Sequence, residues 1–405
     1  MMQTRLGTDT MTATERFLTT IHHEEPDRVP YYVMGIPPYS RCYKEFVERE
    51  KRGEFEAFFD DDSNIMITPM GDYTLKYFFG ADVEMTSIGV QGRGRPIYLV
   101  KDDGTIDPDP DAFSKLPPGS EGRYTNGETV HGVKILAGGD RYTWYLDGAL
   151  KKKEEAIKFY DEHGWLASLP VSKAKVDAYV AFNKQFGDRM YLVPQIGGVQ
   201  LYESMWVIMG QARFAYYCRN DPAYIQRLVD DRKEAQLHIL DEIARYKPAA
   251  VFGGDDMGQK GRPLMSPDVF RKFFKRPYSE IFKKIHDMGA IAFNHSCGNI
   301  TELLPDYIEA GLDGWQSLEP ASLIDHATLK KKYGDRFLFV GGLDSREISF
   351  GTPESIQKHV RAQVLAMGRG GGYIAGPTHA FLTETPRDNC IAGRDAIQRE
   401  GRYPL

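Results

Sequence analysis

The sequence predicts an α/β fold, a (β/α)8 barrel of the TIM type, from three observations. From about residue 150 onward, short apolar runs alternate with amphipathic helical segments. The runs are apolar at consecutive positions, as in parallel strands that are covered on both faces. About eight strand–helix units fit into the 405 residues, which is the number that closes a barrel. A doubly wound sheet is the alternative, but its usual early glycine-rich phosphate loop is not visible.

The first part of the chain supplies a helix, a strand and an insertion. Thr12 and Glu15 form a capping-box pattern that begins a helix ending at about Ile21. The run Val29–Met34 then predicts the first strand. Residues from about 85 to 150 have short β-prone runs between turns rich in Asp, Gly and Pro. We interpret them as an insertion of β hairpins in a single barrel domain that spans residues 1–405.

The second part of the chain has a regular rhythm of strands and helices. Six predicted strands are Met190–Pro194, Ala249–Gly253, Ala290–Phe293, Gly314–Leu318, Phe337–Gly341 and Gly372–Ala375. Ser266-Pro267 and Thr352-Pro353 are good N-terminal signals for two of the helices between them.

Polar residues follow all six of these strands, where a barrel places its active site. In chain order they are Gln195 with Glu203, Asp255 with Asp256, His295 with Cys297, Glu319, Asp344 with Arg346, and Thr378 with His379. A barrel that served only as a scaffold would not need acids, histidines and a thiol at consecutive strand ends.

The spacing of His295 and Cys297 indicates a metal site. Residues i and i+2 after a strand can aim at one point, and imidazole and thiolate are ligands that Zn²⁺ prefers. In isolation the pair would be a strand-end turn, with His295 bonded to backbone and Cys297 packed as a small apolar residue. His379 can converge on the same metal, and three protein ligands with one open position are typical of catalytic zinc.

Three acids are candidates for the remaining roles at this site. Glu203, Asp255 and Asp256 can supply a fourth ligand or orient the histidines from the second shell. Read alone, the two aspartates would cap the turn that follows them.

Composition excludes several classes of protein. The net charge is −6, whereas nucleic-acid-binding proteins usually present a basic face. No apolar run reaches the roughly 20 residues that cross a bilayer, and the polar N-terminus lacks a signal-peptide core. We therefore expect a cytoplasmic protein with no nucleic-acid or membrane partner. The four cysteines are widely spaced, so we expect free thiols, with Cys42 and Cys218 in packing roles.

With these residues in place, the chain resembles the uroporphyrinogen decarboxylase superfamily, and within it the corrinoid-dependent methyltransferases of the O-demethylase methyltransferase I type. The resemblance runs from the Thr14-Glu15-Arg16-Phe17 segment to the end of the chain. Its strongest pieces are Gly254–Gly258, Leu264–Pro267, Asn294–Asn299, Gly341–Asp344, Phe350–Pro353 and Gly371–His379. These motifs are specific for the superfamily and less specific for the reaction.

One departure separates the branches. The decarboxylases carry an Arg-Gln-Ala-Gly-Arg-Tyr stretch after the first strand, and its arginines bind substrate carboxylates. The corresponding stretch here, Met34–Tyr39, has no arginine. A substrate with many carboxylates would lose its bidentate partners, which argues against decarboxylation.

The methyltransferase branch implies zinc held by His-x-Cys and a later Cys. His295 and Cys297 match the first two ligands. His379 occupies the third place here, and Cys390 is the less favoured substitute because its position about eleven residues later does not align with the family pattern.

The resemblance implies transfer of a methyl group from a small methylated compound, such as a methoxylated aromatic, to the cob(I)alamin of a separate corrinoid protein. Zinc would act as a Lewis acid on the atom that bears the methyl group. Asp256 or Glu203 could protonate the departing oxygen. A decarboxylase and a non-catalytic corrinoid-binding scaffold are the alternatives. A homodimer is plausible by resemblance only.

Overall fold

The computed structural model of the chain describes residues 8–36, 40–50, 67–68, 71–89, 98–100, 121–125, 133–137, 143–147, 150–196 and 200–405. Within these ranges, seven strands form one parallel sheet in the order β15-β14-β13-β12-β9-β8-β3. Their bounds are β3 Val83–Ile88, β8 Tyr191–Ile196, β9 Ala250–Gly254, β12 Ile291–His295, β13 Gly314–Ser317, β14 Leu338–Leu343 and β15 Tyr373–Pro377. The six strands expected after residue 150 are confirmed.

The expected first strand joins the two edges of this sheet. Tyr31 bridges Ala375 of β15, and Tyr32 bridges Val83 of β3, both in parallel. The Tyr32 N–H donates to the Ala375 carbonyl at 2.8 Å, and the Asp82 N–H donates to the Tyr31 carbonyl at 2.8 Å. The sheet therefore curls into a TIM-like barrel, as predicted.

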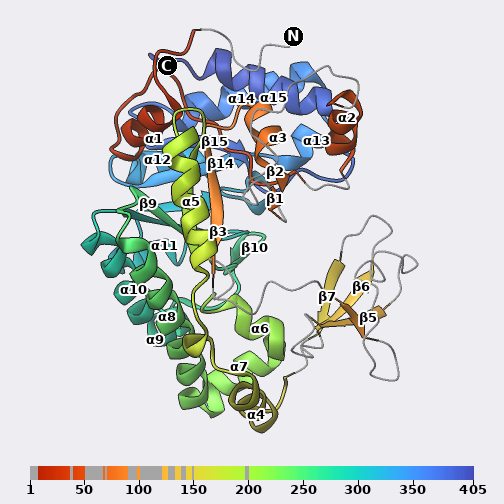
Figure 1. Cartoon of the computed structure of the whole chain (residues 1–405), viewed down its shortest axis with the longest axis vertical. Coiled ribbons are helices and arrows are strands. Elements are labelled where there is room, and N and C mark those ends of the chain that lie inside the picture. Colours follow the sequence, from red (N-terminus) through yellow and green to blue (C-terminus); the bar gives the residue numbers. More distant parts are fainter. Residues whose placement is uncertain are drawn as a thin grey trace.

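Helices surround the strands (Figure 1). In chain order they are α1 Ala13–Ile21, α2 Arg41–Glu50, α3 Tyr73–Phe78, α4 Lys153–His163, α5 Lys173–Phe186, α6 Glu203–Met209, α7 Gln211–Asn220, α8 Pro222–Ala244, α9 Pro267–Phe273, α10 Lys275–Asp287, α11 Leu304–Glu309, α12 His326–Tyr333, α13 Ser345–Phe350, α14 Pro353–Met367 and α15 Arg387–Glu400. The capping box at Thr12 and the caps at Ser266 and Thr352 are present as predicted. None of these helices is long and apolar enough to cross a membrane.

The insertion is a small sheet of its own, and it begins later than the sequence suggested. The strands β4 Tyr98–Val100, β5 Glu121–Thr125, β6 Val133–Ala137 and β7 Thr143–Asp147 pair antiparallel in that order. Figure 1 shows them apart from the barrel strands. The expected start at about residue 85 is wrong, because β3 pairs with β8 through Ile88 and belongs to the barrel. Two short antiparallel pairs complete the strands: β1 Ile67–Thr68 with β2 Gly71–Asp72, and β10 Gly258–Gln259 with β11 Arg262–Pro263.

Apolar side chains fill the barrel interior toward the amino ends of the strands. Phe252, Phe293, Val340 and Ile374 pack there in one buried cluster, which Phe17 of α1 joins. Side chains two positions further along a strand face the same interior. Residues at the carboxyl ends of the strands, such as His295, therefore lie next to this core.

A buried ionic network lies at the amino end of the barrel. Asp82, immediately before β3, is fully buried and binds the guanidinium groups of Arg16 at 2.8 Å and Arg28 at 2.6 Å. Asp27 pairs with Arg16 at 2.7 Å, and Asp9 pairs with Arg28 at 2.9 Å. Each buried guanidinium therefore has more than one carboxylate partner, which offsets the cost of removing these charges from water.

Candidate metal and active site

Three potential metal ligands converge at the carboxyl end of the barrel. His295 is the last residue of β12, Cys297 follows it, and Asp256 follows β9, which pairs with β12. One ligand atom from each lies within 4.8 Å of the other two, the one such group of at least three residues in the described part of the chain. The His295 Nε2 lies 3.1 Å from the Asp256 Oδ1 and 3.2 Å from the Cys297 Sγ.

Two glycines bring the loops after β9 and β12 together. Gly298 adopts a φ of +72°, and a Cβ there would lie 2.3 Å from the backbone of Gly258. A Cβ on Gly258 would in turn lie 2.4 Å from the Cys297 carbonyl oxygen. Only glycine permits such a backbone approach at positive φ. The approach holds the Cys297 N–H at 2.8 Å from the Asp256 carboxylate.

The two adjacent aspartates have different surroundings. Asp255 is 1% exposed and accepts hydrogen bonds from the backbone N–H groups of Tyr202 and Glu203, at 2.8 and 2.7 Å, and from the Tyr278 hydroxyl at 2.6 Å. Burial raises its pKa to about 6 although these hydrogen bonds oppose the rise. Asp255 therefore orients the start of α6 and with it Glu203, and a catalytic role for Asp255 stays a prediction.

Asp256 is partly exposed and faces the candidate metal ligands. Burial works against its charged form, but the hydrogen bond and positive charge of His295 lower the pKa of Asp256 to about 2. Burial likewise opposes a charge on His295, yet the charges and hydrogen bonds of Cys297 and Asp256 raise the pKa of His295 well above its usual value. The Cys297 thiol has a raised pKa, first because of burial, and His295 opposes that rise.

Glu203 is a second acid beside this group. Burial, followed by the negative charges of Asp256 and Asp255, raises the pKa of Glu203 to about 7. A carboxyl group with that pKa keeps a proton at neutral pH far more readily than an ordinary glutamate. The sequence placed Glu203 at the end of β8, and the structure brings it to the Asp256 side of the group.

The third expected ligand, His379, does not belong to the converging group. Its side chain is exposed, and its backbone N–H bonds the Ser345 hydroxyl at 3.2 Å. The pKa of His379 is lowered, first because the surrounding protein partly desolvates the ring and second because of the positive charge of His295. The alternative ligand, Cys390, is fully buried with its Sγ 3.3 Å from that of Cys42. The structure thus favours Asp256 as the third donor.

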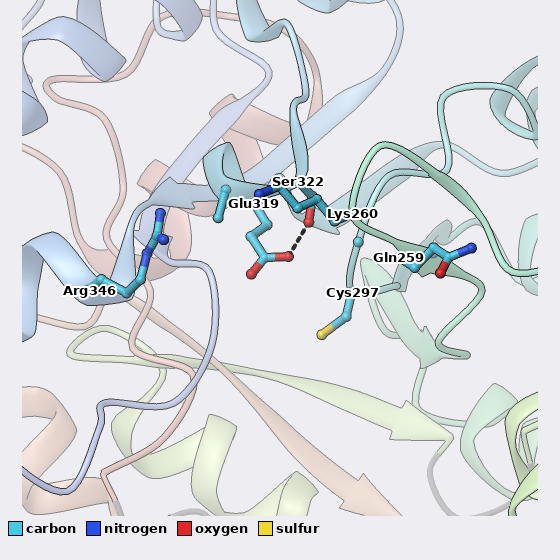
Figure 2. A pocket seen from close by; sticks show the side chains of 9 residues that line it. Gln259, Lys260, Cys297, Glu319, Ser322 and Arg346 are labelled. Atoms are coloured by element: carbon cyan, nitrogen blue, oxygen red, sulfur yellow. Dashed lines mark hydrogen bonds between the residues drawn. The ribbon is translucent and has the colours of Figure 1, made fainter.

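A cavity of about 340 Å³ opens beside Cys297. In Figure 2 the Cys297 thiol and the Glu319 carboxylate point into it, and Arg346 lies on the Glu319 side. The Ser322 hydroxyl donates to Glu319 at 2.5 Å, and Arg346 is bonded to Asp344 at 2.7 Å. Of the three converging residues, Cys297 lines this cavity.

The donor set and its spacing fit zinc. Zinc takes Cys sulfur at about 2.3 Å and His nitrogen or carboxylate oxygen at about 2.0–2.2 Å, so neighbouring ligand atoms of a tetrahedral site lie about 3.3–3.8 Å apart. The separations of 3.1 and 3.2 Å at His295 are close to that range. Three protein donors leave one position for another molecule.

Sequence reasoning missed Gln316, which lies beside His295 on β13. Its Oε1 contacts the His295 Nδ1. The available signal was the position of Gln316 inside the predicted buried strand Gly314–Leu318. A buried amide needs hydrogen-bond partners, so such a residue points to a polar neighbour.

Comparisons with known proteins agree with the architecture. The structure resembles a methyltransferase from Methanosarcina mazei with a TM-score of 0.55, at 16% identity over 96% of this chain and 98% of that one. A glycerophosphoryl diester phosphodiesterase from Parabacteroides distasonis aligns over 97% of this chain and 94% of its own, at 8% identity, but its TM-score is only 0.36. A comparison with curated proteins found no match.

The family comparison covers the part of the chain that carries the site. The family model "Uroporphyrinogen decarboxylase (URO-D)" matches residues 183–399, which include β8 to β15 and every candidate ligand. The match extends over more than half of the 405 residues. The chain therefore belongs to the uroporphyrinogen decarboxylase family.

Proposed function

We propose that the protein is a zinc-dependent methyltransferase that moves a methyl group from a small methylated compound to the cob(I)alamin of a corrinoid protein. The observation that carries the proposal is the convergence of Asp256, His295 and Cys297 at the mouth of the barrel. Family membership and the fold shared with a methyltransferase support an enzyme of this kind.

The three donors would hold the metal from two neighbouring loops. His295 would bind through Nε2, Cys297 through its thiolate and Asp256 through one carboxylate oxygen. When bound there, zinc would supply Lewis-acid activation of the heteroatom that carries the methyl group. The carboxylate and thiolate together carry two negative charges, which offset the charge of the ion.

Glu203 is the proposed proton donor. As the methyl group leaves, the electron pair of its bond to the heteroatom stays with the heteroatom, which takes the proton from Glu203. The two electrons of cob(I)alamin form the new cobalt–carbon bond. The raised pKa of Glu203 suits proton donation near neutral pH.

The cavity beside Cys297 is the proposed entrance for the methyl donor. Its described lining includes three charged side chains, Lys260, Glu319 and Arg346. This lining favours a small methyl ether or thioether with further polar groups.

Metal analysis with a methyl-transfer assay tests the proposal. Wild-type protein should bind about one zinc per chain, and His295→Ala and Cys297→Ser should lose it while staying folded. Zinc-loaded wild type should convert cob(I)alamin to methylcobalamin with a suitable methyl ether or thioether, which absorbance spectra follow. Wild type that binds no zinc after loading would contradict the proposal. Activity that survives full zinc removal would contradict it as well.

A further inference from the structure

Gln316 contacts the candidate metal site from the neighbouring strand and is not itself part of the ligand group. It lies on β13, where the parallel register places it directly opposite His295 of β12. Its side chain is fully buried. The Gln316 Oε1 contacts the His295 Nδ1, and the Gln316 Nε2 has no hydrogen-bond partner in the described structure.

The two nitrogens of His295 therefore face different neighbours. Nδ1 faces the amide of Gln316, and Nε2 faces Asp256 at 3.1 Å and Cys297 at 3.2 Å. An amide oxygen is only an acceptor, so the contact requires a hydrogen on Nδ1. If Nδ1 keeps its hydrogen toward Gln316, Nε2 is the nitrogen that can give up its hydrogen and bind a metal, on the side of the other two donors.

We propose that Gln316 is a positioning residue that fixes the metal-binding tautomer and ring orientation of His295. The inference rests on the proposed zinc site and deepens it. Histidine ligands of metals usually donate their second N–H to a carboxylate, a carbonyl or water. Here a neutral amide takes that place, so orientation is achieved without another negative charge near Asp256 and Glu203.

The unpaired Nε2 of Gln316 argues against a packing role. A buried N–H group without a partner loses its hydrogen bonds to water and gains none in return, and a leucine at this position would avoid that cost. Among the described residues, His295 is the one hydrogen-bond partner of this side chain. The amide therefore serves the histidine at the expense of stability.

A second histidine–glutamine pair in the same molecule provides a control. His326 on α12 contacts Gln363 on α14, with 3.0 Å between Nδ1 and Oε1. Neither residue belongs to the ligand group. Gln363→Leu removes the same kind of hydrogen bond without touching His295.

The experiment measures zinc affinity by chelator competition in wild type, Gln316→Leu, Gln316→Glu and Gln363→Leu. Gln316→Leu should weaken zinc binding by about 10- to 100-fold, as loss of an outer-shell partner does. Gln316→Glu retains an acceptor and should bind zinc within a few-fold of wild type. Gln363→Leu should leave affinity unchanged.

Nitrogen NMR of histidine-labelled, zinc-loaded wild type gives a readout that is independent of activity and of the Gln316 variants. His295, assigned by comparison with His295→Ala, should carry its hydrogen on Nδ1 and coordinate through Nε2. Coordination through Nδ1 would overturn the inference even if Gln316→Leu did not fold.

The outcomes separate the two proposals. If wild type binds zinc and Gln316→Leu binds it equally well, the role of Gln316 is rejected and the proposed function stands. If wild type binds no zinc, the proposed function is rejected and the inference falls with it.

Discussion

The two ends of the barrel both bury charge, but they balance it differently. At the amino end, Asp82 lies between the guanidinium groups of Arg16 and Arg28, so its charge is fully matched. At the carboxyl end, Asp256 and Glu203 lie near a thiol and one histidine, and no arginine or lysine pairs with either carboxylate in the described structure. At the amino end, permanently charged guanidinium groups balance the carboxylates, whereas at the carboxyl end the one positive partner of Asp256 in the described structure is His295, whose charge depends on pH. The first arrangement suits a stabilising network, and the second suits the binding site proposed above.

The largest effect is expected at the amino end. Asp82→Ala leaves two buried guanidinium groups without their shared partner, and should lower the free energy of unfolding by about 3–5 kcal/mol. Urea denaturation measures this loss. Asp268→Ala is the control, because its pair with Arg271 is exposed and should contribute about 0–1 kcal/mol. Equal losses in the two variants would remove the distinction between the network and an ordinary surface pair.

Asp256→Asn tests the carboxyl end. It removes a proposed ligand and should weaken zinc binding by more than about 100-fold, or roughly 2.7 kcal/mol at about 1.36 kcal/mol per tenfold. The loss of a direct ligand should cost more affinity than the loss of an outer-shell partner. The free energy of unfolding of the metal-free protein should fall by a smaller amount, because the ion pair with His295 is lost and the bond from the Cys297 N–H is weakened. Asp255→Asn should show the reverse pattern, since Asp255 bonds Tyr202, Glu203 and Tyr278 instead of facing the ligands. Chelator competition measures zinc affinity and urea denaturation measures the free energy of unfolding in both variants.

Glu203 predicts a pH dependence of stability in the metal-free protein. The pKa of Glu203 is about 7 in the folded chain, above its value in the unfolded chain. The contribution of the protonated carboxyl group to the free energy of unfolding is therefore fully present below about pH 4.5 and is lost as the pH rises through about 7. Glu203→Gln should remove this part of the decline. Urea denaturation from pH 4.5 to 8 measures it, and an unchanged slope in the variant would show that Glu203 titrates normally.

The smallest effect is expected at His379. Because its side chain lies outside the ligand group, His379→Ala should change zinc affinity by less than about threefold, under 1 kcal/mol. Isothermal titration with zinc measures this change. A loss as large as that in Asp256→Asn would restore His379 as the third ligand.

The sequence predicted the strand ends more successfully than the contacts between them. His295, Cys297 and Asp256 could be placed together because parallel strands end at one side of a barrel. Gln316 could not be connected with His295, because that contact depends on the register of β12 against β13. His379 also follows a strand, but the path of its loop depends on the Ser345 hydroxyl, which the pattern of apolar residues does not reveal. Asp255 and Asp256 are neighbours in the sequence, and their surroundings differ through the hydrogen bonds that Asp255 accepts from the start of α6 and from Tyr278.

The closure of the barrel at Tyr31 has a consequence for synthesis of the chain. Tyr31 and Tyr32 join β3, which is made early, to β15, which is made near the end. At roughly 5–20 residues per second, the ribosome needs on the order of tens of seconds to reach Ala375 after Tyr31. Throughout that time the first strand has no partner on one side, and its apolar face is available to chaperones or to other nascent chains. The barrel is therefore expected to close only after nearly all of it has left the ribosome.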